Sequence, residues 1–318
     1  MFHLRQVILT SSQRTILSDL LESFSSEDVY AQSYSISGYL HQRTDFFRLA
    51  PPFLKDIFLS YLDAGSFADA LVIKNCPLDL DLPSTPLDES PSFFKSTFLS
   101  EHLLLMASTL LGTPFAIDAE NAGFLIHNIY PVKKLSQNQS SKSSGVMLTL
   151  HTELSCMTDP PDFLVLLGLR TADYKVNTPI LKLDELLDFL TESEIALLYE
   201  PLFITEIDES LRKDLNSTVF TEPFRILSLV DGIRVWRYDV EYTRGITPES
   251  QAVVQKIVAV HGPLFHNVVI DPGDLLVINN TRVAHGREPF EAKYDGSDRW
   301  LQRVNIHLSD TQKTFYKV

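Results

Sequence analysis

The stretch VVIDPGDLLVINNTRVAHGREPF, Val268 to Phe290, decides the fold. It consists of an apolar segment, a turn at DPGD, a second apolar segment, and a third segment that contains His285. Short apolar runs bounded by proline, glycine and aspartate are typical of buried strands joined by tight turns. The stretch therefore predicts consecutive strands of a buried sheet, with a histidine on the last of them.

Strand-like segments of similar length continue on both sides of this stretch. Each is short and rich in leucine, β-branched or aromatic residues. Many short strands packed behind helices favour a double-stranded β-helix (jelly roll) or a related sandwich, so we expect a mainly β fold with added helices. The segments are 123–132, 146–153, 162–170, 225–240 and 299–308.

Helices are predicted mainly in the first part of the chain, and two more interrupt the strands. We expect a single domain over 1–318, in which residues 1–115 pack on a jelly-roll core of 116–318 that carries a helical insert at about 184–222. A buried strand is predicted at 69–79. The predicted helices are 11–24, 51–65 and 98–112, one that begins at the capping box Thr191–Glu194, and one with Thr247 as N-cap before Pro248.

The charge balance excludes several classes of partner. The chain of 318 residues has 27 basic and 41 acidic residues, a net charge of −14. Nucleic acids and anionic membranes need a basic surface, so we expect neither as a partner. The longest apolar run, at 163–169, is too short to cross a bilayer. Two cysteines form no disulfide framework, which favours a reducing cytoplasm. We expect a monomer or homodimer that acts on a small molecule.

Two polar segments are predicted to be irregular. The stretch KKLSQNQSSKSSG at 133–145 is rich in serine and lacks periodicity, so it is a loop. It is either a disordered linker or an active-site lid, because it directly precedes the strand with His151. The region 205–221 is either a second lid or an ordinary surface connection.

The motif HTE places His151 and Glu153 two residues apart on a predicted strand, so both side chains point to the same face. Alone, this motif is weak evidence for a metal site, and a hydrogen-bonded surface pair explains it equally well. With His285, however, these residues complete the 2-His-1-carboxylate set of non-haem Fe(II) oxygenases. Arg299 and Arg303, four residues apart on another strand, add two guanidinium groups suited to carboxylates.

Other functions remain open at this point. A nucleic-acid oxygenase or another small-molecule oxygenase has a similar arrangement of ligands, although the net charge disfavours the first. A zinc hydrolase uses the same three ligands but has no need of the two arginines. A non-catalytic jelly-roll metal-binding module explains the strands and leaves the arginines without a role.

Two blocks of sequence resemble a known family. LHTELSCMTDPPDFLVLLGLR and GDLLVINNTRVAHGREPFEAKYDGSDRWLQR are similar to the clavaminate synthase-like Fe(II)/2-oxoglutarate oxygenases, and within these to the hydroxylases of free arginine, asparagine and lysine. The resemblance implies a jelly-roll dioxygenase of specialised metabolism. With Fe(II), 2-oxoglutarate and O2, it would hydroxylate an unactivated C–H of a polar L-amino acid, at Cβ or Cγ, and release succinate and CO2.

The resemblance also implies roles for individual residues. His151, Glu153 and His285 match the iron ligands. Arg299 matches the arginine that holds the distal carboxylate of 2-oxoglutarate, and Thr178 matches a threonine that contacts the same molecule.

The expected substrate contacts follow from the same comparison. Arg303 matches the arginine that binds the α-carboxylate of the amino acid, and Ser141 matches a loop serine nearby. Asn121 and Asp239 match polar residues that face the amino or side-chain groups of the substrate, and Glu153 borders them.

Three positions depart from the family pattern. Thr178 lies in NTP rather than in the usual threonine pair, and SCMTDPP replaces the usual segment after the glutamate ligand. Arg237 stands where an arginine-specific relative has an acid. A basic residue there repels a guanidinium, so free arginine is disfavoured as a substrate.

Overall fold

The structure is a computed structural model of the chain. It describes residues 2–24, 36–63, 69–89, 95–117, 123–207, 211, 218–230 and 232–308. None of the described helices has the length and apolar character needed to span a membrane.

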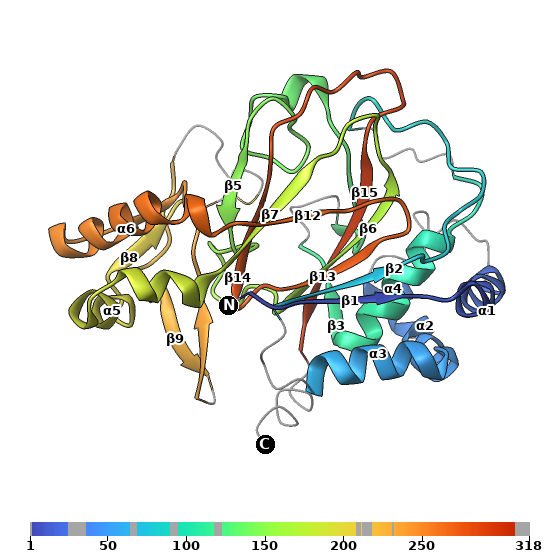
Figure 1. The fold of residues 1–318 in the computed structure, drawn as a ribbon, viewed down its shortest axis with the longest axis horizontal. Coiled ribbons are helices and arrows are strands. Elements are labelled where there is room, and N and C mark those ends of the chain that lie inside the picture. The colour runs from blue at the N-terminus through green and yellow to red at the C-terminus, as the bar shows by residue number, and fades with distance from the viewer. Residues whose placement is uncertain are drawn as a thin grey trace.

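Two sheets dominate the described residues (Figure 1). The larger has seven strands in the order β1-β2-β13-β6-β15-β3, with β4 also paired to β15, and the smaller has four in the order β12-β7-β14-β5. All pairs except β1–β2 are antiparallel. The strands are β1 Leu4–Ile8, β2 Ala70–Lys74, β3 Thr113–Phe115, β4 His127–Ile129, β5 Leu148–His151, β6 Phe163–Arg170, β7 Asn177–Lys182, β12 His266–Val269, β13 Leu275–Asn279, β14 Val283–Arg287 and β15 Trp300–His307.

Alternation along the central strands explains how the two sheets face each other. On β6, Leu164 and Leu166 pack with Ile180 of β7 and Val283 of β14, in the apolar layer between the sheets. Neighbouring residues such as Val165 point to the opposite side and pack against helices. Side chains that alternate in this way give the large sheet two buried faces. The predicted jelly-roll sandwich is confirmed.

Helices cover the outer faces of the sandwich, at opposite sides of the molecule (Figure 1). The large sheet packs against the first four helices, and the small sheet packs against α5 and α6. The helices are α1 Ser11–Glu22, α2 Ile36–Leu49, α3 Pro52–Asp63, α4 Leu99–Leu111, α5 Glu192–Leu198 and α6 Pro248–Val260. Beside α5 and α6 lie two small sheets, formed by β8 Phe203–Thr205 with β11 Thr243–Gly245 and by β9 Leu227–Val230 with β10 Ile233–Trp236.

Most predicted helix boundaries are confirmed to within a few residues. Thr191 forms the predicted capping box, and Thr247 is the predicted N-cap, which forms a capping box with Ser250 as well. The exception is α2, which the sequence did not predict. Its first turns contain serine and glycine, which have low helix propensity.

A buried polar cluster attaches α4 to the sheet. Nζ of Lys95 contacts Asp79 at 2.9 Å and Glu101 at 2.7 Å, and all three side chains are almost fully buried. Glu101 in turn accepts a 2.7 Å hydrogen bond from Gln302 of β15. Despite burial, Lys95 holds the pKa of Asp79 below its usual value. The cluster therefore links the helical layer to the strand that carries the predicted arginines.

Replacement of Lys95 by alanine should lower the free energy of unfolding by about 3–5 kcal/mol, because two buried carboxylates would lose their cation. Chemical unfolding followed by circular dichroism measures this loss. The matched control is Lys293→Ala, which removes a lysine from an exposed pair with Asp173 and should leave stability unchanged. Equal free energies of unfolding for the two variants would contradict the stabilising role of the cluster.

Candidate metal centre

His151, Glu153 and His285 come together in the space between the two sheets. His151 ends β5 and pairs directly with His285 of β14. Gly286 permits this pairing, because a Cβ at its position would lie 2.5 Å from the carbonyl oxygen of Leu148. The tertiary structure therefore brings His285 next to His151 and Glu153, which lie more than 130 positions earlier in the sequence.

The ligand atoms of these residues surround one point. Nε2 of His151 and Nε2 of His285 each lie 3.7 Å from Oε2 of Glu153, and a ligand atom from each residue lies within 4.8 Å of the other two. Ligands bound to one ion at about 2.1 Å can be no more than about 4.2 Å apart. The 3.7 Å separations fall within that limit, so a single cation fits the group with small adjustments.

The hydrogen bonds of the group also fit a cation. Nδ1 of His151 lies 2.7 Å from the carbonyl oxygen of Thr149, which accepts only if Nδ1 carries the proton. Nε2 is then free to bind a metal, as in known metal sites. Oε2 of Glu153 is buried and receives no hydrogen bond from any described residue. An acceptor without a donor in such a place is costly unless a cation approaches it.

Asn280 positions the carboxylate ligand and was not predicted from the sequence. Its side-chain oxygen accepts a 2.7 Å hydrogen bond from the backbone N–H of Glu153, and its amide donates to the carbonyls of Glu153 and Pro161. Asn280 therefore fixes the chain at the turn after β5. The available signal was a buried-looking asparagine pair, Asn279 and Asn280, at the end of an apolar strand.

Charges within the group shift the pKa values strongly. Burial disfavours the charged form of Glu153, but Arg303 and the two histidines hold its pKa well below the usual range. Burial and the neighbouring His151 lower the pKa of His285 to about 3. Burial opposes protonation of His151, yet the nearby carboxylate of Glu153 raises its pKa to about 9. The carboxylate therefore stays ionised and attracts positive charge to this point.

Arg303 projects from the opposite sheet and forms an ion pair with the carboxylate. Its Nη1 lies 2.7 Å from Oε1 of Glu153, and its Nη2 lies 3.3 Å from Nδ1 of His127. Burial, followed by the nearby Arg303, lowers the pKa of His127 to about 3, so this ring is neutral. Arg303 thus occupies one oxygen of Glu153 and leaves the other facing the histidines.

Two further arginines lie in the interior near the triad. Arg299 and Arg287 are 7% and 4% exposed, and neither has an ion-pair partner among the described residues. Burial, reinforced by Arg287, lowers the pKa of Arg299 to about 9. Thr178 of β7 is also buried, on the same face as Ile180, which packs between the sheets. Neither of the two guanidinium groups, of Arg287 and Arg299, is neutralised by an acidic residue in the part of the chain that the structure describes.

The remaining predicted residues are less closely tied to the triad. Ser141 is half-buried in the 133–145 loop, and Asn121 lies outside the described residues. Asp239 forms a β-bridge with His151, but its Oδ1 accepts hydrogen bonds from the backbone N–H groups of Glu241 and Tyr242. Part of its carboxylate therefore stabilises a turn.

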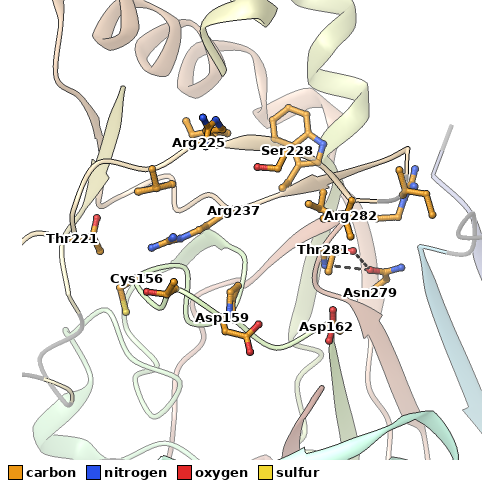
Figure 2. Close-up of a pocket in the computed structure, with 18 of the residues that line it drawn as sticks. Cys156, Asp159, Asp162, Thr221, Arg225, Ser228, Arg237, Asn279, Thr281 and Arg282 are labelled. Atoms are coloured by element: carbon orange, nitrogen blue, oxygen red, sulfur yellow. Dashed lines mark hydrogen bonds between the residues drawn. The ribbon is translucent and has the colours of Figure 1, made fainter. Parts of the chain in front are cut away.

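A cavity of about 930 Å³ opens beside the loop that follows Glu153 (Figure 2). Its walls are largely apolar, and the side chain of Arg237 points toward the side of the cavity where Thr221 and Cys156 lie in the close-up. The guanidinium stacks on Phe224 at 4.1 Å, and its Nε donates a hydrogen bond to the carbonyl oxygen of Ser155. Arg237 forms no ion pair with a described residue, although Asp159, Asp162 and Glu222 also line the cavity.

Comparisons with known proteins agree with this geometry. The family model for taurine catabolism dioxygenase TauD, TfdA family matches residues 106–305. The chain is 29% identical over 307 residues to an L-lysine 3-hydroxylase from Catenulispora acidiphila, covering 94% of this chain and 83% of that protein. It is 30% identical over 259 residues to an enduracididine beta-hydroxylase from Streptomyces hygroscopicus, covering 74% and 76%.

A solved structure also matches nearly the whole chain. The non-heme iron oxygenase OrfP, in complex with Fe and alpha-ketoglutaric acid, superposes with a TM-score of 0.83 at 28% identity, covering 96% of this chain and 94% of that one. The predicted fold and the predicted resemblance to amino-acid hydroxylases are both confirmed.

Replacement of His285 by alanine should weaken the binding of a divalent cation by at least about 100-fold, because loss of a direct ligand costs more than loss of its hydrogen-bond partner. Titration with Co(II), followed by its visible absorption, measures the affinity. His127→Ala is the matched control, since it removes a buried imidazole that contacts Arg303 but lies outside the triad. Equal cation binding by the wild type and the His285 variant would contradict this site.

Proposed function

We infer the function of this chain from the fact that it belongs to the taurine catabolism dioxygenase TauD, TfdA family. It is an oxygenase that uses Fe(II), 2-oxoglutarate and O2. It hydroxylates an unactivated C–H of a polar L-amino acid or a derived metabolite, at Cβ or Cγ. One oxygen atom of O2 enters succinate, which is released with CO2, and the other enters the new hydroxyl group.

His151, Glu153 and His285 hold the iron in this proposal. The observation that carries it is Oε2 of Glu153, which is buried without a hydrogen-bond donor and faces Nε2 of both histidines at 3.7 Å. Two imidazoles and one carboxylate are the donor set of non-haem Fe(II) oxygenases. When bound, iron supplies the centre at which 2-oxoglutarate is chelated and O2 is reduced, and so couples decarboxylation to hydroxylation.

Arg299 holds the distal carboxylate of 2-oxoglutarate, with Thr178 as a second contact. A buried guanidinium without an acid partner is expensive, and a bound carboxylate removes that cost. The location of Arg299 supports this role. It directly precedes β15 and lies four residues before Arg303, so in an extended chain both side chains project to the same side.

The amino-acid substrate binds next to the triad. Arg303 contacts its α-carboxylate through the edge that Glu153 does not occupy, and Ser141 lies in the loop nearby. Glu153, Asn121 and Asp239 supply acceptors for its amino or side-chain groups. Because the triad is mostly buried, the bound substrate also excludes water from the reacting C–H bond.

The wider setting follows from the composition and the topology. The chain is one domain in this proposal, because β1 and β2 are hydrogen-bonded into the sheet that contains β13 and β15. Neither Cys76 nor Cys156 forms a disulfide, which favours a reducing cytoplasm. The net charge of −14 supports a small-molecule substrate and argues against a nucleic acid or a membrane as partner. We expect a monomer or homodimer.

Anaerobic addition of Fe(II) and then 2-oxoglutarate tests the reaction class. A weak visible charge-transfer band should form only when both are present. Succinate release, screened over the twenty amino acids, then identifies the substrate, and mass spectrometry should find a product heavier by one oxygen atom. Absence of the band in the folded wild-type chain would refute the oxygenase assignment.

Arg299→Ala should raise the concentration of 2-oxoglutarate needed for half-maximal succinate release by about 10–100-fold, since a charge-assisted hydrogen bond is lost. The maximal rate should fall less. Arg48→Ala is the control, because Arg48 lies exposed on α2 and should leave the requirement unchanged. If the Arg299 variant needs no more 2-oxoglutarate than the wild type, Arg299 does not bind 2-oxoglutarate.

Arg237→Asp should change which substrates are accepted. Arg237 faces the cavity beside the loop of Glu153, where its charge repels a substrate that ends in a guanidinium. We expect the ratio of turnover with L-arginine to turnover with L-asparagine to rise by at least about 10-fold, as removal of a like charge contributes several kcal/mol. Succinate assays with both amino acids measure the ratio.

The control for this test is Arg225→Asp, which makes the same charge change at an exposed residue of the same cavity. An equal change in both variants would mean that the overall charge of the cavity, rather than the position of Arg237, selects the substrate.

A further inference from the structure

We propose that Arg287 is a second anion-binding residue beside Arg299, and that its guanidinium couples the order of the 133–146 loop to binding of the distal carboxylate of 2-oxoglutarate. The inference rests on the proposed function, because it takes 2-oxoglutarate as the ligand. It adds Arg287, which the sequence analysis did not assign, and gives a specific role to the loop for which the sequence left a linker or a lid open.

The first observation is the unsatisfied guanidinium of Arg287. The residue is 4% exposed, and its Nε and Nη1 are buried without a hydrogen-bond partner among the described residues. Its contact with the ring of Phe290, at 5.1 Å, supplies no acceptor. Two buried donors on one cation require an anion, because an isolated buried charge costs several kcal/mol.

The second observation is the direction of the side chain. Val283 of β14 packs between the sheets, whereas Ala284 packs on the outer face. By alternation, His285 and Arg287 project into the interior with Val283. His285 pairs with His151 and Arg287 pairs with Leu148, so the register shift places the extra residue on β5. The alternation of β14 is therefore preserved. Arg287 therefore points into the same space as the triad and Arg299.

The third observation is that the remaining nitrogen of the same guanidinium contacts the loop. Nη2 of Arg287 donates to Oγ of Ser143 at 2.8 Å and to the carbonyl oxygen of Val146 at 2.9 Å. Ser144 adds contacts to the segment after β14, through the backbone N–H of Phe290 and the hydroxyl of Tyr294. These contacts bury Ser143 and Ser144 to 1% and 2% exposure.

One side chain therefore has two functions that depend on each other. The fork of Arg287 offers Nη2 to the loop and Nε and Nη1 to the interior. A carboxylate held between Arg287 and Arg299 removes the repulsion between the two cations and keeps Arg287 in place for the loop. By linkage, a closed loop strengthens carboxylate binding by the same factor.

Trypsin provides a direct readout of the loop. The peptide bond between Lys142 and Ser143 is a trypsin site, and the burial of Ser143 protects it while the loop is closed. The full chain is loaded anaerobically with Fe(II) and digested with or without 2-oxoglutarate, and mass spectrometry follows cleavage at this bond. The comparison ligand is 2-oxopentanoate, which has the same carbon chain but no distal carboxylate.

In the wild type, 2-oxoglutarate should slow cleavage after Lys142, and 2-oxopentanoate should not. Arg287→Gln should abolish this protection and weaken 2-oxoglutarate binding, measured by calorimetry, by about 10–100-fold. Ser143→Ala retains the charge and removes one bond to the loop. It should speed cleavage in the absence of ligand and weaken 2-oxoglutarate binding only a few-fold.

The matched control is Arg170→Gln. Arg170 is also an interior-facing arginine at the end of a strand, but its guanidinium donates to Thr85 and to the carbonyls of Leu82, Pro83 and Gly296. This variant should keep the 2-oxoglutarate-dependent protection. If Arg287→Gln does not fold, Arg287→Lys replaces it, since the lysine retains the charge but cannot bridge the loop and the ligand.

Two results separate the inference from the function on which it rests. Wild-type affinity and wild-type protection in the folded Arg287 variant would overturn the role of Arg287 and leave the oxygenase assignment intact. Failure of the wild-type chain to bind 2-oxoglutarate would overturn both.

Discussion

The structure depends on the ion pair that keeps Glu153 charged between the two sheets. Burial penalises the carboxylate, and Arg303 offsets that penalty from the opposite sheet at 2.7 Å. Because Arg303 takes only Oε1, Oε2 is left to face the two histidines. Asn280 fixes the backbone of Glu153 and so maintains this division. The ion pair between Arg303 and Glu153 therefore links the two sheets and leaves Oε2 of Glu153 available to a cation.

Strand β15 joins this site to the rest of the fold. Arg303, and Arg299 directly before the strand, face the centre of the sandwich, whereas Trp300 and Gln302 point outward. Gln302 donates to Glu101 of α4, which is held in turn by the buried Lys95. The helical layer thus fixes the strand from behind. The precision that the site requires comes from residues that never contact it.

The charge of the interior contrasts with that of the whole chain. The protein has fourteen more acidic than basic residues, yet Arg237, Arg287 and Arg299 have no ion-pair partner among the described residues. Arg299, which directly precedes β15, is close enough to Arg287 for the two charges to interact, whereas Arg237 faces a cavity whose lining includes none of the three triad residues. Arg287 and Arg299 therefore leave room in the interior for an anionic ligand.

The sequence by itself determined the class of fold, most helix boundaries and the residue types of the centre, because strand alternation, capping boxes and the HTE motif are local signals. It did not predict α2, Asn280 or the two-sided contact of Arg287, and it could not show that Arg303 pairs with Glu153. Only the tertiary structure decided these points. The contacts of Asn280, Arg287 and Arg303 join residues more than a hundred positions apart, for which no local pattern exists, and α2 forms against the low helix propensity of its first turns because it packs in the helical layer.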